Sequence, residues 1–158
     1  MALDVGQAAP NVTLVDENRK EVRLADLPRP VVLLFFPAAF SGGCEKEMCT
    51  IRDMWHAFST LGVPVYGISV DMPYAQKAFK DHHSLPMTFL SDFNKEAIRA
   101  FGVVWPALGG TLREVANRAA FVLDLQGVVR YRWIGEAPGA EPPYDDVTRA
   151  IERVKATA

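Results

Sequence analysis

The two cysteines of the chain, Cys44 and Cys49, lie five residues apart, where an apolar run gives way to a helical pattern. Cys44 falls in the first turn of the expected helix, where unpaired backbone N–H groups and the helix dipole favour an anion such as a thiolate. Ser41 precedes it by three residues and can direct its hydroxyl at an oxygen that the thiolate attacks, while the glycines at 42 and 43 allow close backbone approach. A lone cysteine is commonly a small buried apolar residue. The proline, serine and glycines before Cys44 favour a nucleophilic thiol instead.

Two charged residues could assist such a thiolate. Arg118 immediately precedes the apolar run AAFVLD, so its head could lie near the sheet end that bears Cys44. A fixed guanidinium there stabilises a thiolate, although most arginines at strand ends are simply solvated. The spacing alone leaves both interpretations open, and Arg113 is a weaker competitor. Glu47 could take part in catalysis, or could simply be an acidic residue that the helix dipole stabilises.

Hydrophobic periodicity indicates the elements that must position these residues. The helix that begins at Glu45 has Met48, Ile51, Trp55 and Phe58 on one face. Strands and helices are expected in this order: a hairpin of 11–15 and 21–24, a buried strand 31–36, a helix 45–61, a strand 63–70, a helix 73–81, a strand 87–90, a helix that ends near Gly102, a hairpin of 119–124 and 128–133, and a helix 144–155. Gly109 and Gly110 are assigned to a loop.

Alternating strands and helices imply parallel crossovers, and the late hairpin adds antiparallel strands. We therefore expect one domain over residues 1–158, with a central mixed β-sheet flanked by helices. This is a thioredoxin-like α/β fold with an N-terminal β-hairpin extension. The loop before Cys44 follows a buried strand, and loops at the carboxyl ends of such strands are the usual place for sites.

Composition excludes several functions. The chain has 158 residues, with 17 Lys and Arg against 19 Asp and Glu, so it lacks the basic footprint of a nucleic-acid or membrane-surface binder. No stretch approaches the roughly 18 apolar residues of a membrane span. The first ten residues lack the basic and then apolar pattern of a signal peptide, so we expect a cytoplasmic protein. Two cysteines are too few for a disulfide scaffold.

We expect no metal and no cofactor. Cys44, Cys49 and His56 match no common zinc pattern, which places about two to four residues between paired ligands. His82 and His83 lie at a polar junction between helix and loop and are expected to be solvated. The sequence contains no glycine-rich phosphate loop and no Ser–His–Asp spacing.

The segment Pro37-x-x-x-Ser41-x-x-Cys44 resembles the active-site pattern of peroxiredoxins, and the order of elements agrees along nearly the whole chain. The runs AAFSG at 38–42 and NRAAFVLD at 117–124 resemble the AhpE branch. A second cysteine five residues on resembles the bacterioferritin-comigratory, or peroxiredoxin Q, branch.

The resemblance implies that Cys44 is the peroxidatic cysteine. It implies that Pro37 shields Cys44, that Ser41 hydrogen-bonds the peroxide and that Arg118 supports the thiolate. Glu47 matches a glutamate that is common three residues after the peroxidatic cysteine. Glu45 departs from the proline or threonine often found next to that cysteine, and it adds negative charge beside the thiolate.

On one intact helix, the Cα atoms of Cys44 and Cys49 would be about 8.6 Å apart, beyond the roughly 4.4–6.8 Å of a disulfide. We therefore hypothesise that a Cys44 sulfenic acid forms, the first helical turns unwind, and Cys49 condenses with it. A dithiol such as thioredoxin would reduce the disulfide. Alternatively, Cys49 is a core residue beside Met48 and Ile51.

The first functional hypothesis is thus a thiol peroxidase acting on hydrogen peroxide, alkyl hydroperoxides or peroxynitrite. The alternatives are a one-cysteine AhpE-like peroxidase resolved by an external thiol, a thioredoxin-like dithiol oxidoreductase, and a non-catalytic partner-binding domain. The second alternative is disfavoured because four residues separate the cysteines, where thioredoxin-like motifs have two. The resemblance to peroxiredoxins also implies a homodimer through the active-site loops, with Phe40 and Trp105 packing across it. Alternatively, Trp105 is buried in the core.

Overall fold

The computed structural model of the chain describes residues 2–41 and 45–157, and within 45–51 it describes the helix but not the side chains. Its elements are β1 (Thr13–Val15), β2 (Glu21–Arg23), a short 3-10 helix (Leu24–Asp26), β3 (Val31–Phe35), α1 (Glu45–Ser59), β4 (Val65–Ser69), α2 (Pro73–His83), β5 (Thr88–Ser91), α3 (Glu96–Phe101), β6 (Val104–Leu108), β7 (Leu112–Ala116), β8 (Ala119–Leu123), β9 (Val129–Ile134) and α4 (Tyr144–Ala156).

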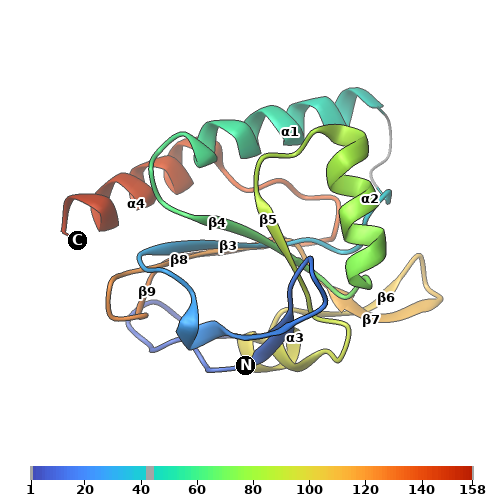
Figure 1. Cartoon of the computed structure of the whole chain (residues 1–158), viewed down its shortest axis with the longest axis horizontal. Helices are drawn as coiled ribbons and strands as arrows, with labels where there is room; N and C mark the ends of the chain where they lie inside the picture. Colours follow the sequence, from blue (N-terminus) through green and yellow to red (C-terminus); the bar gives the residue numbers. More distant parts are fainter. Residues whose placement is uncertain (1, 42–44, 158) are drawn as a thin grey trace.

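Seven strands form the central sheet, in the order β2-β1-β5-β4-β3-β8-β9. β3, β4 and β5 run parallel, whereas β1, β2, β8 and β9 are joined by antiparallel pairings. In Figure 1, α1 and α4 lie above the sheet and α3 lies below it, while the N-terminal hairpin of β1 and β2 forms one edge of the sheet. The expected mixed sheet between helices is confirmed.

β3 is buried on both faces, which explains its uninterrupted apolar run. Val32 and Leu34 pack with side chains of α1, α2 and α4, whereas Val31, Leu33 and Phe35 face the core that includes α3. Because successive side chains of a strand point to opposite faces, a strand between two cores must be apolar at every position. This strand is therefore the rigid element that leads into the segment before Cys44.

One hairpin of the fold was not predicted, although the loop at its tip was. Gly109 and Gly110, assigned to a loop, form the turn of a β-hairpin made by β6 and β7, which is a separate two-stranded sheet. Pro106 within β6 cannot donate a hydrogen bond to a neighbouring strand, and a proline is therefore atypical of a strand. The outer part of this hairpin is exposed, so the sequence there has no run of buried apolar residues.

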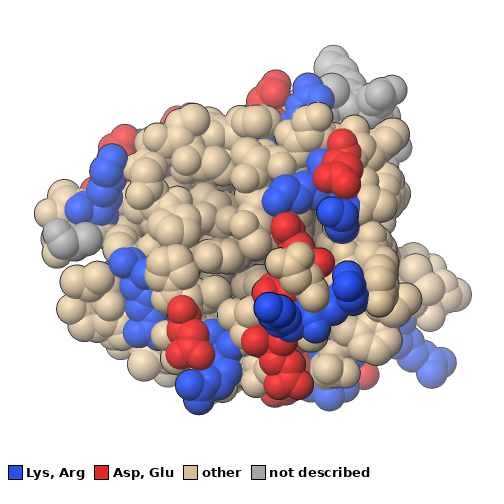
Figure 2. All heavy atoms as spheres, in the orientation of Figure 1, with Lys and Arg blue, Asp and Glu red and all other residues tan. Residues whose placement is uncertain are grey.

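None of the helices in the described residues has the length and apolar character that crossing a membrane requires. Figure 2 shows acidic and basic side chains interspersed over the face in view, without one dominant basic patch on it. This distribution agrees with the near-balanced composition.

Candidate functional site

The site predicted from the sequence lies where β3 leads into α1. Pro37 is buried, Ala38 and Ala39 are half-buried, and Phe40 and Ser41 are exposed. α1 begins at Glu45, so the predicted start of the helix is confirmed. Cys44 lies outside the described residues, as do the side chains of Cys49 and Glu47, and their assigned roles stay predictions.

Ser41 makes its hydrogen bonds within its own segment. Its hydroxyl donates to the carbonyl oxygen of Ala38 at 2.7 Å, and its backbone N–H approaches the same oxygen at 3.4 Å. The hydroxyl proton is therefore engaged with the backbone, while the hydroxyl oxygen can still accept a hydrogen bond. The hydroxyl can therefore accept a hydrogen bond from a peroxide as it stands, whereas it can donate one only after leaving the Ala38 carbonyl.

Arg118 lies at the same end of the sheet as Pro37. The antiparallel register pairs Phe35, the last residue of β3, with Ala119, the first residue of β8, so Arg118 stands beside the start of the Pro37 segment. The arginine is only 9% exposed, which contradicts the alternative of a solvated strand-end residue. Chain topology, rather than spacing, brings Arg118 to the predicted site.

The Arg118 side chain is held in a defined orientation. Its Nε donates to the carbonyl oxygen of Pro138 at 2.8 Å. Its backbone is fixed as well, because its N–H donates to Asn117 Oδ1 at 2.9 Å and its carbonyl accepts from the N–H of Gly135 at 2.8 Å. The small hollow around it is lined mainly by apolar residues, namely Leu34, Phe35, Trp55, Ala119, Trp133 and Pro142. A guanidinium in such surroundings interacts strongly with a nearby anion, because water screens it little.

Arg113, the weaker competitor, does not share this position. It lies on β7 in the separate two-stranded sheet and is exposed. Its backbone carbonyl accepts from Lys95 Nζ at 3.3 Å. Arg118 is therefore the better candidate for stabilising a thiolate.

Asp71 is a residue of the site that the sequence analysis missed. Oδ2 of this carboxylate accepts a 2.6 Å hydrogen bond from the backbone N–H of Ala39 and a 2.8 Å hydrogen bond from Ser69 Oγ. Burial raises the pKa of Asp71 above its ordinary value, although these two donors act in the opposite direction. A signal was present in the sequence, because Asp71 follows β4 at the carboxyl end of a parallel strand.

An aromatic cluster supports the other side of the segment. Phe40 adopts a left-handed backbone conformation with φ of 62°. Its ring centroid lies 5.2 Å from that of Phe79, 5.8 Å from His82 and 6.1 Å from His83. His82 is exposed as expected, whereas His83 is half-buried against Phe79 at 5.2 Å. The ring of Phe40 thus connects the segment to α2.

The metal alternative of Cys44, Cys49 and His56 stays untested, because the side chains of the two cysteines lie outside the described residues. Among them, no group of three or more His, Cys, Asp or Glu side chains is arranged to hold a metal ion. His56 is exposed, and its Nε2 lies 3.3 Å from the carbonyl oxygen of Ser84. Its neighbouring polar group is therefore a backbone oxygen of the loop after α2.

Residues 5–132 match the AhpC/TSA family. The chain belongs to this family. It is 43% identical over 128 residues to the chloroplastic peroxiredoxin Q of Oryza sativa subsp. japonica, covering 80% of this chain but 57% of that protein. It is 37% identical over 135 residues to a protein of Coxiella burnetii described as a peroxiredoxin bcp, covering 84% of this chain and 89% of that protein. The chain thus spans less than two thirds of the plant relatives that it matches.

Solved structures of AhpC/TSA relatives confirm the predicted fold class. A peroxiredoxin-like protein from Aquifex aeolicus superposes with a TM-score of 0.79 at 25% identity, covering 98% of this chain and 89% of that one. The peroxidoxin BcpB of Mycobacterium tuberculosis superposes with a TM-score of 0.73 at 30% identity, covering 99% of each chain. The resemblance to the peroxiredoxin Q and bacterioferritin-comigratory branch is confirmed.

Proposed function

We propose that this AhpC/TSA-family protein is a thiol-specific peroxidase that reduces hydrogen peroxide and organic hydroperoxides through Cys44. The observation that carries the proposal is the buried, oriented guanidinium of Arg118 at the end of β3, the strand that leads toward Cys44. Family membership and the names of the relatives support the same activity.

In the first step, the Cys44 thiolate attacks the terminal oxygen of the hydroperoxide. An S–O bond forms as the O–O bond breaks, and the leaving hydroxide or alkoxide takes up a proton to become water or an alcohol. The sulfur is oxidised to a sulfenic acid while the peroxide is reduced. Arg118 would stabilise the thiolate and the charge that develops on the peroxide oxygens.

In the second step, the Cys49 thiolate attacks the sulfenic sulfur. The S–S bond forms as the S–O bond breaks, and the hydroxyl group leaves as water after taking up a proton. A dithiol reductant such as thioredoxin then supplies two electrons and becomes a disulfide itself. With Cys44 in the first turn of the helix, as the sequence predicts, the first turns of α1 would open before Cys49 reaches it.

Three other residues of the segment and helix have smaller proposed roles. Pro37, which is buried, would exclude water from one side of the reacting sulfur. Ser41 would hydrogen-bond the peroxide through its hydroxyl oxygen, which can accept while the hydroxyl proton is donated to the Ala38 carbonyl. Glu47 would contribute to the hydrogen bonds around the reacting groups. Sulfur itself carries the electrons in this scheme, so it needs neither a cofactor nor a metal.

The mass of the peroxide-treated protein tests both cysteines. We expect wild type to lose about 2 Da as the disulfide forms, and Cys49→Ser to gain about 16 Da as a sulfenic acid. Cys44→Ser should keep its mass and consume no peroxide. If Cys49→Ser turns over with thioredoxin as fast as wild type, an external thiol resolves the sulfenic acid and the one-cysteine alternative holds.

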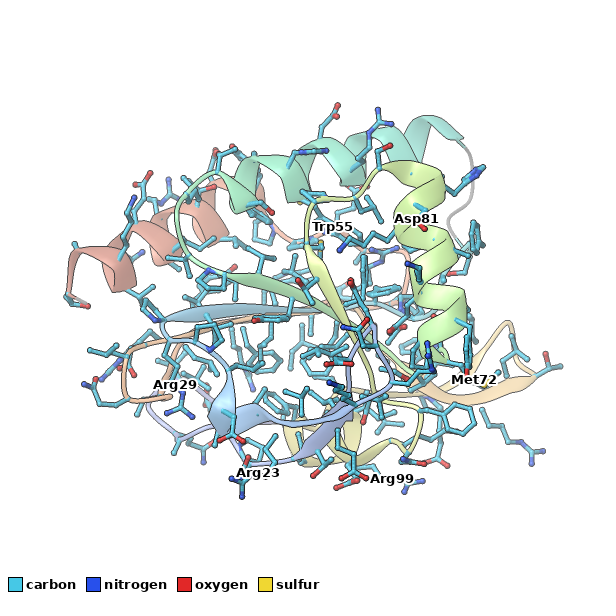
Figure 3. All side chains as sticks on the ribbon, in the orientation of Figure 1. Arg23, Arg29, Trp55, Met72, Asp81 and Arg99 are labelled. Atoms are coloured by element: carbon cyan, nitrogen blue, oxygen red, sulfur yellow. The ribbon has the colours of Figure 1, made fainter. Side chains whose placement is uncertain are left out.

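The fluorescence of Trp55 provides the rate. This residue is 3% exposed on α1, the helix that carries Cys49, and its ring lies 5.9 Å from Phe36. Figure 3 shows it between α1 and the sheet. We expect mixing with peroxide to change the fluorescence much faster than a free thiol is oxidised. A rate no faster than that of a free thiol excludes the peroxidase and leaves the dithiol oxidoreductase.

We also propose that two copies pair through their active-site loops. Phe40 supports this because 54% of its surface is exposed although it lies against α2. Trp105 on β6 is half-buried and remains a candidate for the same surface. Phe40→Ser should shift the dimer toward the monomer in sedimentation, and a wild-type protein that is monomeric at high concentration contradicts the pairing.

A further inference from the structure

One hydrogen bond joins the segment before Cys44 to a different crossover of the fold. The backbone N–H of Ala39 donates to Oδ2 of Asp71 at 2.6 Å, across 32 residues of sequence. Ala39 lies two residues after Pro37 and five before Cys44, whereas Asp71 lies between β4 and α2. The bond therefore connects the ends of two neighbouring parallel strands.

Asp71 is itself held in place by buried side chains. Ser69 Oγ donates to the same Oδ2, and Gln76 Nε2 donates to Ser69 Oγ at 2.9 Å and to the carbonyl oxygen of Leu90 at 3.0 Å. Ser91 Oγ donates to the backbone carbonyl of Asp71. Ser69 and Gln76 are fully buried, and Ser91 is 1% exposed. The carboxylate is thus a fixed acceptor built on β4, β5 and α2.

The segment that Asp71 holds has little regular structure of its own. Between described residues, the other hydrogen bonds of 38–41 run from Ser41 to the carbonyl of Ala38, inside the segment. The ring of Phe40 adds an apolar contact with Phe79. A hydrogen bond to a charged acceptor is stronger than one between neutral groups, so among the described residues Asp71 supplies the main polar restraint from outside the segment.

We propose that Asp71 is a positioning residue, which holds the backbone of residues 37–41 in the conformation in which Cys44 meets peroxide. This inference rests on the proposed function of Cys44. When the bond to Ala39 breaks, the segment gains freedom, and the opened form that lets Cys49 reach Cys44 becomes more populated. The carboxylate therefore favours the first step and opposes the second.

Opposite effects on two steps distinguish this role from a purely structural one. Asp71→Ala should slow the reaction of Cys44 with peroxide by roughly tenfold or more, because it removes an acceptor that two donors share. The same change should speed disulfide formation after oxidation. Asp71→Asn keeps an oxygen that can accept from Ala39, so it should restore most of the peroxide reaction.

Asp92 offers a matched control. This aspartate is 1% exposed, whereas Asp71 is half-buried, and the Asp92 carboxylate likewise accepts from backbone N–H groups, those of Ala97 and Ile98 at 3.0 and 2.8 Å. These donors belong to α3, on the opposite face of the sheet from α1. Asp92→Asn should lower the urea midpoint of unfolding and leave the ratio of the two rates at the wild-type value.

The experiment combines stopped-flow fluorescence, which follows both steps, with amide hydrogen exchange at Ala39. We expect the Ala39 amide to be protected in wild type and Asp71→Asn and to exchange faster in Asp71→Ala. Equal slowing of both steps in Asp71→Ala, or equal exchange at Ala39 in all variants, overturns the inference. If Asp71→Ala does not fold, an unprotected Ala39 amide in the wild type overturns it equally.

Failure of the peroxidase proposal would give a different result from failure of the Asp71 inference. A wild-type protein that does not react with peroxide removes the peroxidase proposal. The exchange rates at Ala39 would still show whether Asp71 restrains the segment, because they require no peroxide chemistry.

Discussion

The Nε atom of Arg118 donates a 2.8 Å hydrogen bond to the carbonyl oxygen of Pro138, and this bond fixes the plane of a guanidinium that is almost fully buried. The two residues lie 20 positions apart, Arg118 directly before β8 and Pro138 in the loop between β9 and α4. The loop before α4 thus takes part in orienting the cation of the candidate site.

Arg118→Lys should lower the rate of the peroxide reaction by about 10- to 100-fold. Lysine keeps the charge but has neither the planar fork nor the Nε that Pro138 holds. The rate is measured from Trp55 fluorescence under excess peroxide. Arg113→Lys, on the exposed hairpin, is the matched control and should react like wild type. Equal rates for Arg118→Lys and wild type would remove Arg118 from the mechanism.

Phe121→Ala should destabilise the protein by about 3–5 kcal/mol. Phe121 is fully buried in β8, and its ring lies 5.8 Å from Phe35 and 5.0 Å from Phe101 in edge-to-face contacts. Truncation removes both contacts and leaves a cavity between the sheet and α3. Urea unfolding measures the loss. Leu112→Ala, at a site 60% exposed, should change the free energy of unfolding little.

Gly67→Ala should cost about 1–3 kcal/mol of stability. A Cβ atom at this position of β4 would lie 2.6 Å from the ring of Phe89 and 2.9 Å from the methyl carbon of Met87. Phe89 is fully buried and cannot move aside easily. Gly139→Ala is the control, because a Cβ there meets nothing within 4 Å. If the two variants unfold at the same urea concentration, the packing around Gly67 is looser than described.

Asp124→Asn should reduce stability at neutral pH and have a smaller effect in acid. Burial raises the pKa of this carboxyl, but the N–H of Val128, the side chain of Arg130 and the N–H of Gln126 outweigh burial and leave the pKa below its ordinary value of 3.8. The carboxylate therefore stabilises the folded state fully above pH 3.8, and this contribution is lost as the pH falls through the lowered pKa.

Urea unfolding of wild type and Asp124→Asn across this range checks the sign. The difference in free energy of unfolding should shrink as the pH falls below 3.8. Asp53→Asn, whose side chain is 76% exposed, is the control and should unfold like wild type at each pH. A difference between wild type and Asp124→Asn that grows in acid would contradict the assigned contacts.

Local patterns were sufficient to predict most elements. Three of these patterns depend only on neighbours in the sequence: the apolar run of β3, the spacing of three residues between Trp55 and Phe58 on α1, and the turn at Gly127. Each of the elements that they predict is present. The hairpin of β6 and β7 was not predicted. Pro106 is atypical of a strand, and the exposed positions do not give the alternation of apolar and polar residues that predicts one. The motif around Cys44 likewise indicates the family without any contact of the tertiary structure.

The contacts that bring Arg118 and Asp71 to the site could be identified only from the tertiary structure. Two arginines, 113 and 118, were both compatible with the spacing, and only the pairing of Phe35 with Ala119 brings Arg118 to the end of β3. Asp71 meets Ala39 across 32 residues because β3 and β4 are adjacent parallel strands. Sequence periodicity depends on residues that are close in the chain. The long-range contacts of Arg118 and Asp71 depend instead on strand order and register, which arise when the elements pack.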